Sequence, residues 1–386
     1  MSLQVDLSKF SEVDLSASTS QEEVDERTRA HADEELRRFW ELDPKSAREA
    51  MHAVIVGGSG YGKTVHAFSA LYNWYKKEKR TIFVIDSPKA ESVRFGKVFG
   101  KQNVIVHYPK WVENSIRIRR ESYNPKPYAD ASELLLNIEP DRFNIDLGFN
   151  MFLESFHSVR GRKVEFKRFV AELSSGLQRT FKDISPATIY IEEAKNILPS
   201  KGHSVVDEQL SLSERMTSLI QVSRGYDFNA LLVTQGLNQI NNGARHEMKY
   251  KFFYYIEDPN FMASNYLSFR WFNYINQQLP PFHFFFWKNS RCYYPVGAIP
   301  PDKVVPFWPE PVDLVYTFTP SVNLNVDDDE KLDQKLLEAW NKYKNYADAS
   351  RYTGINYHTA RYRLQRLIQE KAEGEEGGEN GQSLAH

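Results

Sequence analysis

Short apolar runs alternate with amphipathic segments through the middle of the chain. The runs lie at His52–Val56, Thr81–Ile85, Asn103–His107, Thr188–Ile191, Ala230–Thr234 and Phe252–Ile256. Strands that alternate with helices form βαβ units, so this pattern predicts an α/β fold with a mostly parallel central sheet. Two further runs, Phe282–Trp287 and Arg291–Pro295, are joined around Asn289–Ser290 and predict a terminal β-hairpin.

The segments on both sides of this region are more polar and predict other kinds of structure. The first 36 residues hold ten acidic and three basic side chains, which predicts a mobile arm that buries little and continues into a helix over Gln21–Trp40. Six prolines between Ile299 and Pro320 are incompatible with a helix or a central strand and predict a semi-rigid strap. The Gly- and Glu-rich end of the chain predicts disorder.

Between the strap and the tail, apolar positions recur at helical spacing and predict a helix over Lys331–Tyr343. A second helix over Tyr346–Thr353, a turn at Gly354 and a third helix over Tyr357–Gln369 complete a helix-turn-helix pattern. The side chains that could reach DNA from the third helix and its cap are Asn356, Tyr357, His358, Thr359, Arg361, Tyr362 and Arg363. A small protein-interaction module is the alternative, although arginines interleaved with Tyr and His favour DNA.

Together these segments predict five parts along the chain. They are a polar arm and helix over 1–45, an α/β domain over 46–298, a Pro-rich strap and linker over 299–328, a helix-turn-helix domain over 329–370 and an acidic tail over 371–386.

The composition narrows the class of protein. A net charge of −2 confines any nucleic-acid surface to a local patch, such as the basic stretch Lys76–Arg120. A single cysteine, Cys292, rules out a disulfide framework and a thiolate zinc site. No apolar run approaches the ~18 residues of a membrane span, and the N-terminus lacks the features of a secretion signal. We therefore expect a soluble cytoplasmic protein without membrane insertion.

The strongest chemical signal follows the first apolar run. Residues Gly57, Gly58, Ser59, Gly60, Tyr61, Gly62, Lys63 and Thr64 fit G-x-x-x-x-G-K-[ST], with a strand before them and a helical segment after them. Glycines allow backbone N–H groups to close around phosphates at a helix N-terminus. Lys63 would neutralise the phosphates and Thr64 would offer its hydroxyl to Mg²⁺. A chance Gly-rich turn is the weaker alternative, and the pattern predicts a site for ATP and Mg²⁺.

The apolar run Thr188–Ile191 is followed by two acids, Glu192 and Glu193. They lie at the distance downstream of the loop where a phosphate loop requires an acidic partner. Glu192 would support the metal, and Glu193 would polarise the attacking water. A charged strand end without function is the alternative.

Four segments, taken with this loop, resemble the HerA–FtsK superfamily of ATPases. Glu192–Pro199 (EEAKNILP) is similar to its DEAHNFLP stretch, with Glu192 in place of the usual Asp. Arg224–Gln235 is similar to its R-x-x-G…TQ element, with the spacing kept and Asp227 in place of Gly. Asp86–Glu91 resembles D-P-K-G-E, with Ala90 in place of Gly, and Tyr123–Pro125 resembles the NP after the next strand. The segments occur in the superfamily's order and cover about Ala50 to Ile256.

The resemblance implies a RecA-like P-loop NTPase that forms a ring, usually a hexamer, and moves double-stranded DNA through its centre. Gln235 would sense the γ-phosphate, and Arg224 would complete the neighbouring subunit's site, with Arg215 as a second candidate. The short polar segment before the loop and the lack of membrane spans point to genome packaging or DNA transfer. Portal, capsid or nuclease partners fit this interpretation, as does a location in a host cytoplasm or a virion.

Two other functions stay open at the level of sequence. An ATP-switched, sequence-specific DNA-binding regulator or replication and partition factor would use the same loop and the same helix-turn-helix. A small-molecule kinase is a more distant alternative, because it needs an acceptor pocket and a lid that the sequence does not show clearly.

Overall fold

The computed structural model describes residues 21–43, 50–86, 90–112, 116–117, 123–157, 163–200, 202, 204, 206–223, 226–256, 276–277, 279–288, 291–296, 298–306, 315–316, 326–353, 361, 364–365 and 367–368. The chain divides into two compact units, Met1–Thr317 and Phe318–His386. The division falls within the Pro-rich stretch.

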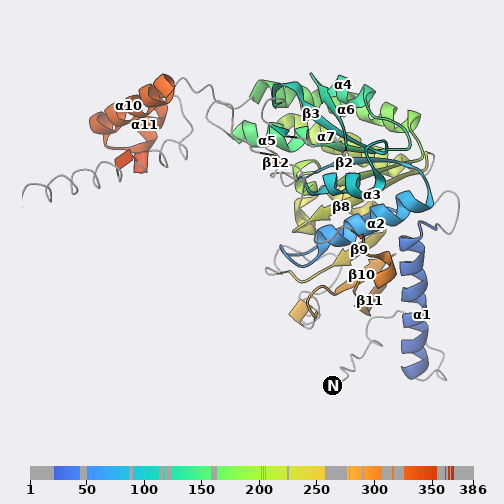
Figure 1. The fold of residues 1–386 in the computed structure, drawn as a ribbon. Coiled ribbons are helices and arrows are strands. Elements are labelled where there is room, and N and C mark those ends of the chain that lie inside the picture. The colour runs from blue at the N-terminus through green and yellow to red at the C-terminus, as the bar shows by residue number, and fades with distance from the viewer. Residues whose placement is uncertain are drawn as a thin grey trace, which may run out of the picture. The chain divides into compact units, whose positions relative to one another are not determined.

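The first unit is built on a ten-stranded sheet (Figure 1). In spatial order the strands are β11 (Arg291–Val296), β10 (Phe284–Lys288), β9 (Tyr250–Phe253), β1 (Ala53–Val56), β8 (Phe228–Thr234), β7 (Ala187–Ile191), β2 (Thr81–Ile85), β6 (Phe143–Asp146), β3 (Val104–Pro109) and β5 (Asn124–Tyr128). All pairs from β9 to β5 are parallel, and β10 joins β9 and β11 antiparallel. The predicted α/β fold and the predicted hairpin are confirmed.

Two strands of this sheet were not expected from the sequence. β6 lies in a segment that reads as helical, and contacts within the segment and from other strands satisfy its polar residues. The Asn144 side chain accepts from Glu139 N at 2.9 Å, and Asp146 accepts from the Tyr128 hydroxyl at 2.8 Å. β5 carries Pro125 and Pro127 and lies at the end of the strand order. An edge position tolerates proline because one side of the strand needs no ladder hydrogen bonds.

Helices cover both faces of the sheet (Figure 1). On one face α1 (Gln21–Trp40), α2 (Lys63–Lys77) and α3 (Phe95–Phe99) pack on alternate strand residues such as Ile55 and Val84. On the other face α4 (Ala131–Leu136), α5 (Gly148–His157), α6 (Lys163–Asp183), α7 (Asp207–Val222) and α8 (Asn242–Glu247) pack on Val56 and Phe83. Because neighbouring strand residues point to opposite faces, a buried parallel sheet needs continuous apolar runs, and this is the pattern in the sequence.

Helix α1 has the predicted bounds but buries more than its polar composition suggested. Phe39 and Trp40 are buried, and the Phe39 ring lies 4.6 Å from that of Phe252 in β9. Glu35 is buried as well and forms an ion pair with Lys288 of β10. The last turns of α1 are therefore part of the core of the first unit.

A small pair of strands and a helical pair complete the described structure. β12 (Val315–Tyr316) pairs antiparallel with β4 (Ile116–Arg117). In the second unit, α11 (Tyr346–Thr353) has the predicted bounds, and α10 (Val326–Tyr343) ends where predicted but begins five residues before the predicted start at Lys331. The two helices pack around Leu336, Ala339, Ala349 and Leu364. The predicted turn at Gly354 and most of the third helix lie outside the described residues.

Within the part that the structure describes, no helix is both long and apolar enough to cross a membrane.

Candidate active site

The predicted phosphate loop connects β1 to α2, so its N–H groups lie at the start of a helix. Gly60 and Gly62 adopt φ of +83° and +97°, a region that side-chain-bearing residues rarely occupy. Gly57 is required for a different reason: a Cβ there would lie 2.6 Å from the Cβ of Tyr254, just beyond β9. The Gly58 N–H donates to the Tyr255 carbonyl at 2.8 Å. The loop is thus held against the end of β9.

Lys63 begins α2 and folds back over the loop, where its Nζ donates to the Gly58 carbonyl at 2.6 Å. A lysine in this position keeps its charge above the loop backbone, where the phosphates of a nucleotide would lie. Ser59 and Gly60 at the tip of the loop are exposed, so the loop is open to a ligand.

Thr64 contacts the first of the two predicted acids. Its hydroxyl donates to Glu192 Oε1 at 3.0 Å, joining the start of α2 to the end of β7. Residues 128 positions apart meet because β8 alone separates β1 from β7 in the sheet. The structure therefore brings together the two side chains that the sequence predicts as metal ligands.

Glu192 is 8% exposed, and its Oε2 has no hydrogen-bond partner among the residues that the structure describes. Burial and the negative charges of Asp86 and Glu91 together raise the pKa of Glu192 to about 8, against the opposing effect of the Thr64 hydroxyl. Asp86 lies beside Glu192 because the residues before them, Ile85 and Ile191, are register partners in β2 and β7. An unpartnered carboxylate oxygen among other acids is a good environment for a hard divalent cation, so the residues present fit Mg²⁺ held through Thr64 and Glu192.

Glu193 adopts φ of +53°, which turns the chain sharply after β7. Its Oε1 accepts from Gln235 Nε2 at 3.3 Å, and its Oε2 lies 3.6 Å from Lys195 Nζ. Gln235 follows directly after β8. The structure therefore also joins the predicted base and the predicted sensor at the carboxyl end of the sheet, with Glu193 more exposed than Glu192 (29% of its side chain).

Asp86 is a buried residue with a positioning role that the sequence did not suggest. Its Oδ2 accepts from the Ser92 N–H at 2.9 Å and from the Ser92 hydroxyl, and Asn150 donates to its backbone carbonyl. These bonds hold the turn of Glu91–Arg94 beside Glu192. The sequence signal was Asp86 at a strand end, but its partners come from two other segments.

Two positions where the superfamily pattern has glycine carry other residues here. Ala90 and Asp227 adopt φ of +50° and +46°, the left-handed region that glycine favours. Arg80 stabilises the chain turn at Asp227, because its Nη2 donates to Asp227 Oδ1 at 3.1 Å. Both residues thus adopt a backbone conformation that glycine would adopt more readily.

The strand order adds topological evidence. From the loop strand outward the order is β1, β8, β7 and β2, so the strand that ends in Gln235 lies between the loop strand and the strand that leads to Glu192. This order, the loop and the paired acids define the first unit as a RecA-like P-loop NTPase fold. The functional residues lie at the carboxyl ends of parallel strands, where open α/β sheets bind ligands.

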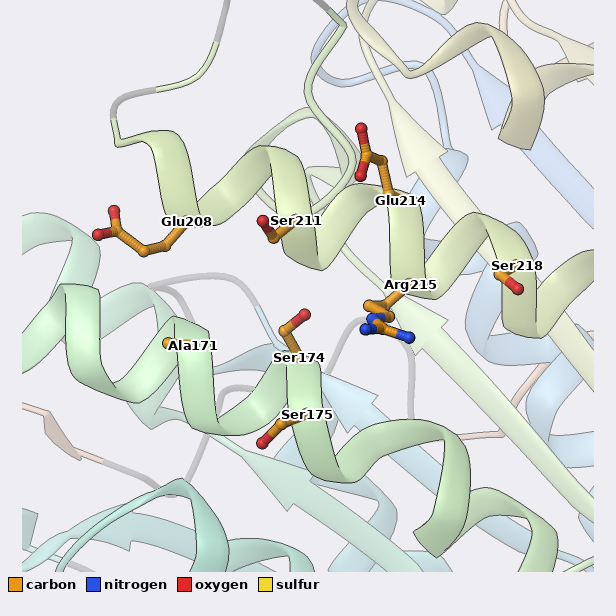
Figure 2. Close-up of a pocket in the computed structure, with 8 residues that line it drawn as sticks. All are labelled: Ala171, Ser174, Ser175, Glu208, Ser211, Glu214, Arg215 and Ser218. Atoms are coloured by element: carbon orange, nitrogen blue, oxygen red, sulfur yellow. The ribbon is translucent and has the colours of Figure 1, made fainter.

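Other predicted site residues are placed only in part. Arg224 lies outside the described residues. Arg215 is exposed on α7 and lines a groove of about 510 Å³ between α6 and α7. Figure 2 shows its guanidinium near Ser174, with Glu208 and Glu214 on α7 at a distance from it. No residue of the phosphate loop lines this groove.

The predicted DNA-contacting residues Asn356, Tyr357, His358, Thr359, Tyr362 and Arg363 lie outside the described residues. Arg361 is described and exposed, and its guanidinium carbon lies 5.9 Å from the centre of the Tyr346 ring. In the basic stretch, Lys110 pairs with Glu133 at 3.1 Å.

Aromatic residues next to the loop were not identified from the sequence. The rings of Tyr61 and Tyr255 lie 4.9 Å apart, and Phe282 approaches Gly62. No sequence signal marked Tyr255 or Phe282, because they reach the loop only through the pairing of β9 with β1 and of β10 with β9.

No family model and no curated protein matches the sequence. Among solved structures, the chain is similar to the genome packaging NTPase B204 from Sulfolobus turreted icosahedral virus 2 in complex with AMPPCP, with 14% identity, a TM-score of 0.38 and coverage of 65% of this chain and 100% of that one. It is also similar to the pCW3 conjugation coupling protein TcpA with ATPγS (14% identity, TM-score 0.35, 64% and 59% covered). A third is Thermomonospora curvata EccC, ATPases 2 and 3 (11% identity, TM-score 0.34, 64% and 38% covered).

Proposed function

We propose that the chain is an ATPase that couples ATP hydrolysis to the movement of double-stranded DNA. One group of contacts at the carboxyl end of the sheet supports the proposed ATPase activity. A phosphate loop has its Thr64 hydroxyl bonded to a buried Glu192, and Glu193 and Gln235 are joined beside it.

The residues divide the chemistry among themselves. The loop N–H groups and Lys63 bind the phosphates and neutralise their charge. Thr64 and Glu192 would hold Mg²⁺, which would offset the negative charge of the phosphate oxygens. Glu193 accepts a proton from the attacking water as that water's oxygen bonds to the γ-phosphorus, and the bond to the β-phosphate oxygen breaks to release ADP and phosphate.

Gln235 orients Glu193 in this scheme. The amide donates to Glu193 Oε1 and can report the presence of a γ-phosphate to β8 through that bond. Lys195 Nζ lies 3.6 Å from the other oxygen of Glu193.

The DNA part of the proposal rests on the sequence resemblance and on the C-terminal helical pair. We infer a ring, most simply a hexamer, in which Arg224 of one subunit completes the site of the next. A guanidinium can stabilise the charge that spreads over the transferring phosphate. Genome packaging or DNA transfer is the role that this arrangement fits best.

The test is steady-state ATP hydrolysis by the full chain, alone and with linear duplex of several lengths or single-stranded DNA. A translocating motor gives a rate that rises with duplex length, and Lys63→Ala serves as the inactive control. A rate that ignores DNA length, together with a footprint on one defined sequence, would instead identify the ATP-switched regulator.

A further inference from the structure

Three aromatic side chains gather at the phosphate loop, on the side away from the catalytic acids. We call Tyr61, Tyr255 and Phe282 the loop aromatic cluster. Tyr61 belongs to the loop itself, Tyr255 follows β9, and Phe282 precedes β10. An ideal Cβ on Gly62 would lie 3.4 Å from Phe282 Cδ1, so this ring is in contact range of the loop.

Phe282 has two unusual properties. Its side chain is 61% exposed, although every other phenylalanine whose exposure is described is at least partly buried. Its backbone has φ of +61°, which is strained for a bulky residue and is tolerated mainly where a function requires it. The chain therefore presents this ring to solvent at an energetic cost, beside a ligand-binding loop.

The two tyrosines form a second aromatic surface at the loop, beside Gly58. Their rings lie 4.9 Å apart with planes inclined by 43°, and both are only half-buried. The Tyr255 carbonyl accepts from Gly58 N–H. This bond fixes the ring pair relative to the loop, so the surface is formed before a ligand binds.

The sheet topology gives the direction in which a nucleotide extends. β1 is flanked by β8 on one side and by β9 on the other. Gln235 and Glu193 lie on the β8 and β7 side, and the γ-phosphate must face them to react. The remainder of the nucleotide then leads toward the end of β9, where the loop aromatic cluster lies.

We propose that the loop aromatic cluster binds the base of the nucleoside triphosphate by stacking, with Phe282 as the main contact. This inference rests on the proposed ATPase function and deepens it, because it assigns the site that recognises the base. Aromatic rings stack on the π-face of a nucleobase, and purines offer the larger face.

The experiment compares two ligands by calorimetry on the full-length protein with Mg²⁺. ATP carries a base, and inorganic tripolyphosphate carries only the phosphates. We expect Phe282→Ala to weaken ATP binding roughly 10-fold, the usual effect of losing one stacking partner, and to leave tripolyphosphate binding unchanged. Phe282→Trp should keep the affinity for ATP, and Tyr352→Ala, which removes an exposed ring from the second unit, should change neither ligand.

The outcomes distinguish a failure of this inference from a failure of the proposed ATPase function. An equal loss for both ligands would mean that Phe282 only supports the loop, and no loss for ATP would place the base elsewhere; either result overturns the inference. A change in oligomeric state without a change in the ratio of the two affinities would assign the cluster to a subunit contact and also overturn it. Wild-type protein that binds neither ligand would overturn the proposed ATPase function itself.

Discussion

At the scale of single residues, two neighbouring glutamates of the site lie in different surroundings. Glu192 is buried next to Asp86 and Thr64, whereas Glu193 turns outward and meets Gln235 and Lys195. In the proposed function, the same side chain would serve as a metal support at one position and as a base at the next. The difference follows from the left-handed backbone of Glu193, which reverses the direction of the chain after β7.

Glu193→Gln tests this assignment. The amide keeps the size of the side chain and can still bond to Gln235, but it cannot accept the proton of the water. We expect unchanged ATP affinity and a rate of hydrolysis lowered by about 100-fold or more, the range of general-base catalysis. Phosphate release and nucleotide binding are measured together, with Glu214→Gln on the exposed face of α7 as the control. Full hydrolysis by Glu193→Gln would remove the residue from the mechanism.

A second residue-scale prediction concerns His107, which is fully buried in β3 with its Nε2 3.2 Å from Asn144 Oδ1. Burial and the positive charge of Lys126 lower the pKa of His107 to about 4, against the opposing effects of the Asn144 bond and the negative charge of Glu139. The unfolded chain takes up the proton below about pH 6.5. The folded protein is therefore favoured above pH 6.5 and loses this contribution as the pH falls toward 4.

His107→Gln removes that pH dependence. The free energy of unfolding of the wild type relative to the variant should fall by about 2 kcal/mol between pH 8 and pH 5. Urea unfolding of both proteins at the two pH values measures this difference, in which the other titrating groups cancel. A difference that does not change with pH would show that His107 is protonated equally in the folded and unfolded states.

At the scale of elements, the first unit depends on contacts between segments far apart in the chain. Helix α1 is joined to β10 by the ion pair of Glu35 and Lys288, both at most 2% exposed. Lys288 Nζ also donates to the Tyr250 hydroxyl at 2.5 Å and lies 4.1 Å from the centre of that ring. A buried pair of this kind specifies where α1 docks more than it adds to stability.

Lys288→Met should therefore be strongly destabilising, because it leaves the Glu35 carboxylate buried without its cation. We expect a loss of about 3–5 kcal/mol in the free energy of unfolding, measured by urea titration. The double variant Glu35→Leu with Lys288→Met should recover most of that loss. Arg37→Ala, which breaks exposed ion pairs on the same helix, should stay close to the wild type. A mild effect of Lys288→Met alone would show that water reaches the pair.

At the scale of the whole molecule, the proposal requires that neighbouring subunits share each site. Glu193→Gln and Arg224→Ala should each be inactive as pure proteins. When the two are mixed, some sites combine an intact Glu193 from one subunit with an intact Arg224 from the next. We expect ATP hydrolysis to reappear in the mixture and to rise with protein concentration. Mixtures that stay inactive while the subunits assemble would place Arg224 outside the shared site, and the exposed Arg215 would be tested in the same way.

Much of the architecture could be read from local patterns. All six apolar runs became sheet strands, with ends within three residues of the expected ones, because a strand buried on both faces must be apolar throughout. Helix α1, the hairpin and the two helices α10 and α11 also formed where expected. β6 and β5 were missed because both contain residues that are unusual in strands: Asn144 and Asp146 in β6, and Pro125 and Pro127 in β5. Only the neighbouring strands of the sheet make these residues acceptable.

The sequence by itself determined the chemistry of the loop. Gly57–Thr64 and the pair Glu192 and Glu193 are local signals, since a phosphate loop needs glycines, a lysine and a hydroxyl within a few residues. Tertiary structure decided which partners those residues meet. Strand order placed Glu192 against Thr64 and Gln235 against Glu193, and the pairing of β9 with β1 brought Tyr255 to the loop. These contacts join residues far apart in the chain, and the spatial order of strands in a sheet is set by global packing rather than by any local pattern.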